Sequence, residues 1–381
     1  MIRILALIMF VEIIQAPSQS PLFSPAPGSP VAVGEGPGQV VLADVNGDGH
    51  LDMVTRHLQS RIVTTQLGDG AGRFVAAPGS PIVVGYQPGD IKLGDVNNDK
   101  IPDLGVTSSD RDTVDIFLGN GKGGFSPSPG SPFTVSAVVE FYTRSLHLVD
   151  INEDGKLDIV TANRRRNTFS TLLGNGRGGF APGPTTTFLS GQGEYIFDFG
   201  DMDGDKLLDV VTVSGLRGDF AEPSRVTLYR GDGKGAFKNA SESPISAPAG
   251  AHFLTLGDMN GDRRLDVVIS HSGDQLSVLS NNGAGKFSPA PGSPYNLGVE
   301  AFGVFVADVN QDRRNDLIAA TVDSVMALLG DGRGFAPAPG SPFSAGPGAY
   351  NLAVGDLNED GKLDIVASSF EGKAVTVLLG R

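Results

Sequence analysis

Cysteine is absent from the 381-residue sequence, which excludes disulfide bonds and thiol catalysis. Positive charge is scarce: 29 Lys and Arg stand against 43 Asp and Glu, and the net charge of −14 argues against a nucleic-acid partner. No apolar run is long enough to span a membrane. A phosphate-binding loop, a dinucleotide fingerprint and a Ser-centred nucleophile elbow are also missing, so the enzyme classes that depend on those motifs are not indicated.

What the sequence does contain is a nine-residue motif, Asp44-Val-Asn-Gly-Asp-Gly-His-Leu-Asp52, written seven times. We call the seven copies the Asp loops and number them in chain order. Each has Asp at its first, fifth and ninth positions, and its third position is Asn in six copies and Asp203 in loop 4. The loops begin at Asp44, Asp95, Asp150, Asp201, Asp258, Asp308 and Asp356, which gives a repeat of about 50 residues.

Oxygen ligands at alternate positions suit a hard cation that prefers six or more oxygens, which indicates Ca²⁺ rather than Zn²⁺. An EF-hand is excluded because its loop needs Glu at the twelfth position and a helix on each side. The twelfth residue of loop 1 is Thr55, and the flanking residues are β-branched and typical of strands. Positions 1, 3, 5 and 9 of the loops hold 22 of the 43 acidic residues, and seven bound Ca²⁺ would neutralise the formal charge.

Each repeat predicts four short strands. In the first repeat these are 39–43, 51–55, 61–67 and 82–84, with a glycine-rich turn, Gly68 to Phe74, after the third strand. The Pro-Gly-Ser-Pro segment at 78–81 recurs in other repeats, and proline is tolerated at the outer edge of a sheet. The fourth strand is therefore expected to be the outermost one.

Seven such units predict an all-β fold, a seven-bladed β-propeller of four-stranded antiparallel blades spanning residues 22–381. The last unit stops after its third strand, and its missing aromatic residue, Pro-Gly-Ser-Pro segment and fourth strand stand at 23–33. We expect this N-terminal segment to complete the last blade and close the ring. A solenoid would instead need capping repeats, and none is visible.

The repeat resembles the FG-GAP/VCBS repeat, the calcium-bearing blade of integrin α-subunit head propellers and of many bacterial secreted proteins. The residues that carry the resemblance are 355–366 followed by 375–380, together with their six equivalents. It implies that each loop binds one structural Ca²⁺ through positions 1, 3, 5 and 9 and the backbone carbonyl of position 7. The implied ligands are Asp44, Asn46, Asp48, His50 and Asp52; Asp95, Asn97, Asp99, Ile101 and Asp103; Asp150, Asn152, Asp154, Lys156 and Asp158; Asp201, Asp203, Asp205, Leu207 and Asp209; Asp258, Asn260, Asp262, Arg264 and Asp266; Asp308, Asn310, Asp312, Arg314 and Asp316; and Asp356, Asn358, Asp360, Lys362 and Asp364.

The sixth position departs from the family pattern. Three loops have glycine there, and the other four have Lys100, Lys206, Arg263 and Arg313. A non-glycine residue in the left-handed region costs roughly 1 kcal/mol, and a cation beside the site weakens Ca²⁺ binding. We expect all seven loops to bind calcium, the three glycine loops most tightly.

The function is expected on the face opposite the Asp loops, where the blades differ. Six residues before each loop lies a first ring: Gly38, Gly89, Arg144, Tyr195, His252, Phe302 and Tyr350. Five residues after each loop lies a second ring: His57, Ser108, Asn163, Ser214, His271, Thr321 and Ser369. Aromatic rings beside hydrogen-bonding groups predict a sugar or peptide site, with Tyr195, His252, Phe302, Tyr350 and His271 as its residues. Ordinary packing at the mouth of the channel is the alternative.

Two classes of function follow. The favoured one is a non-enzymatic binding or adhesion module for an extracellular glycan or protein. The alternative is a carbohydrate-active enzyme such as a polysaccharide lyase, with His57, His252, His271, Arg144 and Tyr350 as candidates for the base and the carboxylate clamp. Residues 1–20 resemble a secretory signal, with a basic start at Met1-Ile-Arg3 and an apolar run from Ile4 to Val11. We therefore expect a secreted, monomeric protein.

Overall fold

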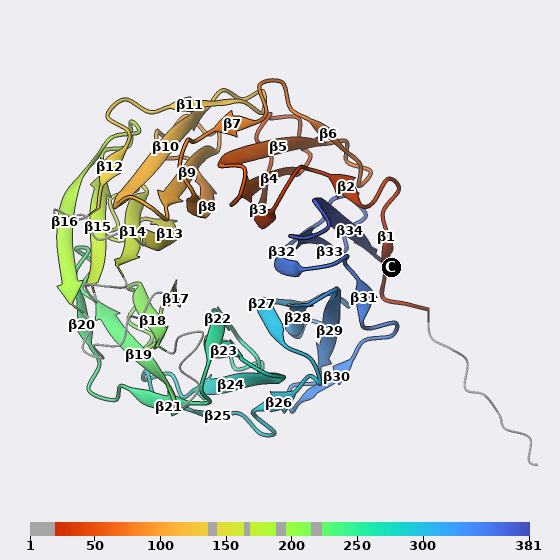
Figure 1. The fold of residues 1–381 in the computed structure, drawn as a ribbon. Helices are drawn as coiled ribbons and strands as arrows, with labels where there is room; N and C mark the ends of the chain where they lie inside the picture. Colours follow the sequence, from red (N-terminus) through yellow and green to blue (C-terminus); the bar gives the residue numbers. More distant parts are fainter. Residues whose placement is uncertain (1–19, 136–142, 164–167, 188–195, 215–222) are drawn as a thin grey trace, which may run out of the picture.

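The seven repeats form seven blades around a central axis in a computed structural model of the chain (Figure 1). The structure describes residues 20–135, 143–163, 168–187, 196–214 and 223–381. The proposed signal at 1–20 therefore lies outside the described residues except for its last position. Within the described residues there is no helix, and hence no helix that could cross a membrane.

Each blade is an antiparallel sheet whose strands follow one another from the axis to the rim. The innermost strands are β3 (Pro37–Ala43), β8 (Pro88–Gly94), β13 (Thr143–Val149), β17 (Ile196–Gly200), β22 (Ala251–Gly257), β27 (Ala301–Ala307) and β32 (Ala349–Gly355). The second strands are β4 (Asp52–His57), β9 (Asp103–Ser108), β14 (Asp158–Asn163), β18 (Asp209–Ser214), β23 (Asp266–His271), β28 (Asp316–Thr321) and β33 (Asp364–Ser369). The third strands are β5 (Ile62–Gly68), β10 (Thr113–Gly119), β15 (Thr168–Gly174), β19 (Ser224–Gly231), β24 (Gln275–Asn281), β29 (Ser324–Gly330) and β34 (Ala374–Gly380).

The outermost strand differs from the expectation, because in six blades it consists of two short pieces that both pair with the third strand. The first piece begins at the aromatic residue that was expected to close the glycine-rich turn. The pairs are β6 (Phe74–Ala76) and β7 (Ile82–Val83), β11 (Phe125–Pro127) and β12 (Phe133–Thr134), β20 (Phe237–Asn239) and β21 (Ile245–Ala247), β25 (Phe287–Pro289) and β26 (Tyr295–Asn296), β30 (Phe335–Pro337) and β31 (Phe343–Ser344), and β1 (Phe23–Pro25) and β2 (Val31–Ala32). Blade 3, which lacks the Ser-Pro pair, has one continuous strand, β16 (Phe180–Thr187).

A serine side chain bridges the break between the two pieces. In blade 1 the backbone N–H of Thr65 on β5 donates to Oγ of Ser80 at 2.9 Å, where an unbroken outer strand would supply a carbonyl. The same bond forms in every blade that has the break, through Ser29, Ser131, Ser243, Ser293 and Ser341. The serine of Pro-Gly-Ser-Pro is thus present to satisfy a strand donor that the break would leave without an acceptor.

The core lies between the blades. All six residues of every second strand are buried, and seven clusters of buried apolar side chains each join two neighbouring blades. The expected closure is confirmed: β1 and β2 pair with β34, so the N-terminal segment is the rim of blade 7. Phe23 also packs edge-on against Phe343 of blade 6, with ring centroids 5.3 Å apart. The ring is therefore closed, and the positions of all seven blades on both faces of the disc are defined.

Candidate functional site

The seven Asp loops join the first strand of each blade to the second, and side-chain oxygens organise their backbone. In loop 1 the carboxylate of Asp44 accepts the N–H groups of Gly47 and Gly49 at 2.6 and 2.9 Å. Oδ1 of Asn46 accepts the N–H of Asp48, and Oδ1 of Asp48 accepts the N–H of His50, both at 2.9 Å. The carboxylate of the first Asp accepts the N–H of position 6 in every loop, so the backbone of all seven loops turns around the equivalent carboxylate.

Two positions of each loop have positive φ. Position 6 was the one that the sequence indicated, and all seven of its residues have positive φ, including Lys100 at φ 70° and Arg313 at φ 68°. Position 4 was missed, although it too is left-handed in every loop, as Gly47, Asn98, Glu153, Gly204, Gly261, Gln311 and Glu359. Loops 2 and 6 have no glycine at either position, so they carry the most backbone strain.

The ninth Asp has a second task that the sequence did not predict. In loop 1 Oδ2 of Asp52 accepts the N–H of Val45 at 2.9 Å, and Oδ1 accepts the N–H of Gly68, the last residue of β5, also at 2.9 Å. All seven loops repeat this pair of bonds. This side chain therefore ties the loop to the third strand of its blade.

Burial affects the ionisation of the ninth Asp. Desolvation raises the pKa of all seven carboxyls, and the other loop carboxylates add to the effect. The pKa reaches about 6 for Asp103, Asp209, Asp266 and Asp364. A cation among the loop oxygens would stabilise the ionised form and oppose this shift.

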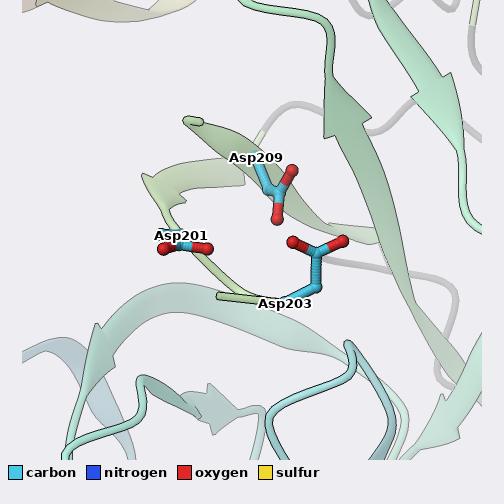
Figure 2. Close-up of side chains that lie close together, drawn as sticks. All are labelled: Asp201, Asp203 and Asp209. Atoms are coloured by element: carbon cyan, nitrogen blue, oxygen red, sulfur yellow. The ribbon is translucent and has the colours of Figure 1, made fainter. Parts of the chain in front are cut away.

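Loop 4 shows how the oxygens converge. Carboxylate oxygens of Asp201, Asp203 and Asp209 lie within 4.8 Å of one another, and the three side chains point toward a common space (Figure 2). Their donor set is purely oxygen, which is the set a hard divalent cation prefers. Nε of Arg230 on β19 lies 2.8 Å from Oδ2 of Asp203. Loop 4 alone has Asp at position 3, and Arg230 compensates the extra charge.

On the opposite face the first ring coincides with irregularities of the innermost strands. In β22, β27 and β32 the register shifts by one residue around His252, Phe302 and Tyr350, so each is the unpaired residue of a β-bulge. Bulges redirect a side chain from the alternation of the strand. Arg144 of β13 is a bulge residue as well, and Gly38 and Gly89 lie within the corresponding shifts of β3 and β8. Tyr195 lies outside the described residues.

The bulges of blades 5, 6 and 7 bring their three rings together. The ring centroids of His252 and Phe302 are 5.9 Å apart, and those of Phe302 and Tyr350 are 6.3 Å apart with an angle of only 20° between the planes. We call His252, Phe302 and Tyr350 the aromatic arc. Tyr350 is 40% exposed, and the neighbouring Val322 is 51% exposed. The carbonyl of Val322 accepts the N–H of Ala349 at 3.0 Å, which places Val322 beside the arc.

Polar groups that the sequence analysis missed surround one end of the arc. Nε2 of His252 lies 2.8 Å from Oε1 of Glu300 and 2.9 Å from Oγ of Ser272. Glu300 immediately precedes β27, so its carboxylate reaches from blade 6 back to blade 5. The side chain of Glu300 is 35% exposed, so it combines a fixed position with access to solvent.

The structure corrects the expectation that the second ring faces a ligand, because all seven of its residues are buried. They end the second strands and hydrogen-bond within their own blades. Nε2 of His271 pairs with Oγ of Ser277 at 2.9 Å, and burial lowers the pKa of His271 to about 4. Nε2 of His57 pairs with Oγ1 of Thr64, also at 2.9 Å. His271 and His57 are therefore buried within their blades, and among the lyase candidates whose side chains the structure describes, His252 and Tyr350 are those on the arc.

Comparison with known proteins supports the repeat assignment. A model of the FG-GAP-like repeat matches residues 95–161, 150–212, 218–269, 258–319 and 308–367. No curated protein matches this sequence. The crystal structure of BBS1N in complex with ARL6DN is similar with a TM-score of 0.67 and 14% identity, over 95% of this chain and 98% of that chain.

Two further structures share the fold at low identity. An Agrocybe aegerita lectin, described as recognising non-reducing terminal N-acetylglucosamine, is similar with a TM-score of 0.55 and 19% identity over 90% of this chain and 86% of that chain. The V. cholerae biofilm matrix protein Bap1 is similar with a TM-score of 0.51 and 11% identity over 95% and 91%. These likenesses show the fold alone. The repeat matches cover more than half of the sequence, and the chain belongs to the FG-GAP-like repeat family.

Proposed function

We propose that the protein is a secreted, calcium-stabilised binding module and that its ligand binds at the aromatic arc. The observation that carries the proposal is the inequivalence of the blades. Three neighbouring blades place a ring at the same bulge, and Tyr350 and Val322 are exposed there. A repeat fold needs no such cluster for its own stability, since the other described blades close without it.

The calcium part of the proposal is supported by the geometry of the Asp loops. Every loop presents oxygen donors from the same positions, and loop 4 brings three carboxylates together. Calcium would be held by positions 1, 3, 5 and 9, with the carbonyl of position 7, and would act as a structural cross-link of each hairpin. At millimolar Ca²⁺ and affinities typical of extracellular modules, each site adds roughly 0.4–1.4 kcal/mol to folding stability.

The arc favours a glycan over a flat protein surface. The C–H face of a sugar stacks on an aromatic ring, and its hydroxyl groups donate to a carboxylate such as that of Glu300. Both elements occur here within one short arc: Phe302 and Tyr350 offer ring surface, and Glu300 is fixed beside His252. The similar propellers include one bound to the protein ARL6DN and one that recognises a sugar, so a protein ligand is the competing outcome of the test.

Secretion is the part of the proposal that rests on the amino-acid composition of the chain and on the calcium concentration outside cells. Calcium reaches millimolar levels outside cells, where loops of this affinity would be filled. The chain has no cysteine that an oxidising compartment could crosslink, and its first residues have the charge and hydropathy pattern of an export signal.

A glycan array probed with the full chain in 1 mM Ca²⁺ tests the ligand. Binding should be lost in Tyr350→Ala, because the exposed ring surface is removed. Val83→Ala is the matched control: Val83 is also exposed, but it lies on the rim in β7 of blade 1. Melting curves of both variants verify the fold. Retention of glycan binding by Tyr350→Ala, or capture of a protein and no glycan, would contradict the assignment.

A further inference from the structure

The face that carries the Asp loops is not uniform, and blades 5 and 6 concentrate its positive charge. Arg263 and Arg264 occupy positions 6 and 7 of loop 5, and Arg313 and Arg314 occupy the same positions of loop 6. Arg333 lies in the glycine-rich turn between β29 and β30. All five side chains are exposed. We call them the basic patch.

Contacts between the two blades make the patch continuous. Nδ2 of Asn315 in blade 6 donates to the carbonyl of Asp258 in loop 5 at 2.9 Å. The pKa of Asp331 is lowered, chiefly by the N–H groups of Arg333 and Gly334 and further by the charges of Arg333 and Arg314. The charges of two arginines from different elements thus act on one carboxylate. Nη1 of Arg264 donates to the carbonyl of Asn282 at 2.8 Å, which holds this arginine over the turn of its own blade.

Charge balance distinguishes this sector from its counterpart. Loops 5 and 6, together with the glycine-rich turn of blade 6 at 330–335, hold five basic and seven acidic side chains. Loops 7 and 1, together with the glycine-rich turn of blade 1 at 68–74, hold two basic side chains, Lys362 and Arg73, and eight acidic ones. A divalent cation in each loop would make the first sector net positive by about two charges and leave the second net negative by about two. Only the first sector then attracts a polyanion.

We propose that the basic patch is a second ligand surface, which binds an anionic polysaccharide, sulfated or uronate, when loops 5 and 6 hold divalent cations. Guanidinium groups pair with sulfate and carboxylate through two parallel hydrogen bonds, and the patch spans two blades as an extended chain requires. The occupant to which we commit is a glycan chain, and nucleic acid is the competing outcome that the comparison with duplex DNA tests. The inference rests on the calcium part of the proposed function and is independent of the aromatic arc.

The variant that tests the patch uses residues this chain already has at the same loop positions. Arg263→Gly and Arg313→Gly introduce the glycine of loops 1, 3 and 7, and Arg264→Leu and Arg314→Leu introduce the leucine of loop 4. The matched control introduces the same residues at the same loop positions elsewhere on this face, in place of lysines: Lys100→Gly, Lys206→Gly, Lys156→Leu and Lys362→Leu. Both variants lose four charges, and the glycines suit the positive φ of position 6.

Binding of the full chain to immobilised heparin is measured in 1 mM Ca²⁺ and in EGTA over a range of salt concentrations. The wild-type chain should bind heparin in 1 mM Ca²⁺ and not in EGTA. The patch variant should bind at least tenfold more weakly, with a salt slope reduced by roughly 3, whereas the control should change less than threefold. Equal losses in the two variants, absence of binding in calcium, or undiminished binding in EGTA would overturn the inference.

Two further measurements separate its failure from failure of the proposed function. Melting curves with and without EGTA report calcium binding directly: if calcium raises the melting temperature and heparin still does not bind, only the basic patch is refuted. Tyr350→Ala should bind heparin as wild type does. A duplex DNA of matched charge should bind more weakly than heparin, and equal or tighter binding of the DNA would refute a glycan as the occupant.

Discussion

The serine in the break of the outer strand gives a prediction whose magnitude follows from one hydrogen bond. In blade 2, Oγ of Ser131 accepts the N–H of Ile116 at 3.0 Å, and Ile116 is fully buried. Ser131→Ala removes the acceptor and leaves the N–H of the buried Ile116 without its hydrogen-bond partner. A buried donor left without a partner costs about 1–3 kcal/mol, so the free energy of unfolding should fall by that amount.

Equilibrium unfolding in urea measures this loss. With a slope of about 3 kcal/mol/M for a chain of this size, the midpoint should fall by roughly 0.3–1 M. Ser126→Ala is the control, because Ser126 lies exposed on β11 of the same blade and its side chain makes no hydrogen bond to the described residues. Ser131→Thr keeps the hydroxyl and should recover most of the stability.

Additivity provides a sharper test of the same idea. Oγ of Ser341 in blade 6 accepts the N–H of Ala327 at 3.1 Å, far around the ring from blade 2. Distant sites that share no partner have additive effects, so Ser131→Ala and Ser341→Ala together should cost the sum of the two losses. If Ser131→Ala behaves as Ser126→Ala does, the serine is a turn residue without a role in the sheet and the reasoning is wrong.

Three other predictions concern charge. Removing calcium with EGTA should lower the free energy of unfolding by roughly 3–10 kcal/mol over seven sites, visible as a lower melting temperature; an unchanged curve would remove the calcium proposal. Arg230→Leu should destabilise the chain by about 0.5–1 kcal/mol, because Asp203 loses its partner, and Asp203→Asn in the same chain should restore stability. Burial lowers the pKa of His147 to about 3, below its unfolded value, so the unfolded chain takes up the proton first and stability should fall as pH drops below about 6.5. His147→Gln keeps the donor to the carbonyl of Phe197 and should shrink the stability difference between pH 7 and pH 5.

The ring could be predicted from the sequence because its information is repeated. Seven copies of one motif fix the blade number, and the aromatic residue and Pro-Gly-Ser-Pro segment at 23–30 supply what the last copy lacks. The structure confirms both, with β1 and β2 paired to β34. Strand boundaries were also close, since β-branched runs end where the Asp loops and glycine-rich turns begin.

Features that depend on a partner across the fold could not be predicted. The serine of the break and the ninth Asp bond to strand donors that are 14–22 residues away in sequence, or 348 residues away for Ser29 in blade 7, at positions that only the register defines. The burial of the second ring was missed for the same reason. His271 has the chemistry of a binding residue, but its place at the end of β23 commits it to Ser277. Glu300 stands outside the repeat motif, so no pattern drew attention to it.

Within this chain the blades act as one another's controls. A residue type that recurs at one position in all seven copies must serve something all blades share, and the ninth Asp and the first Asp do so through backbone bonds. A departure confined to neighbouring blades cannot be explained by the blade itself. The aromatic arc of blades 5 to 7 and the basic patch of blades 5 and 6 are such departures, and they lie on opposite faces of the same sector. Selection for folding alone would leave substitutions scattered around the ring, so the two clusters in one sector support the proposal that ligands bind on this side of the disc.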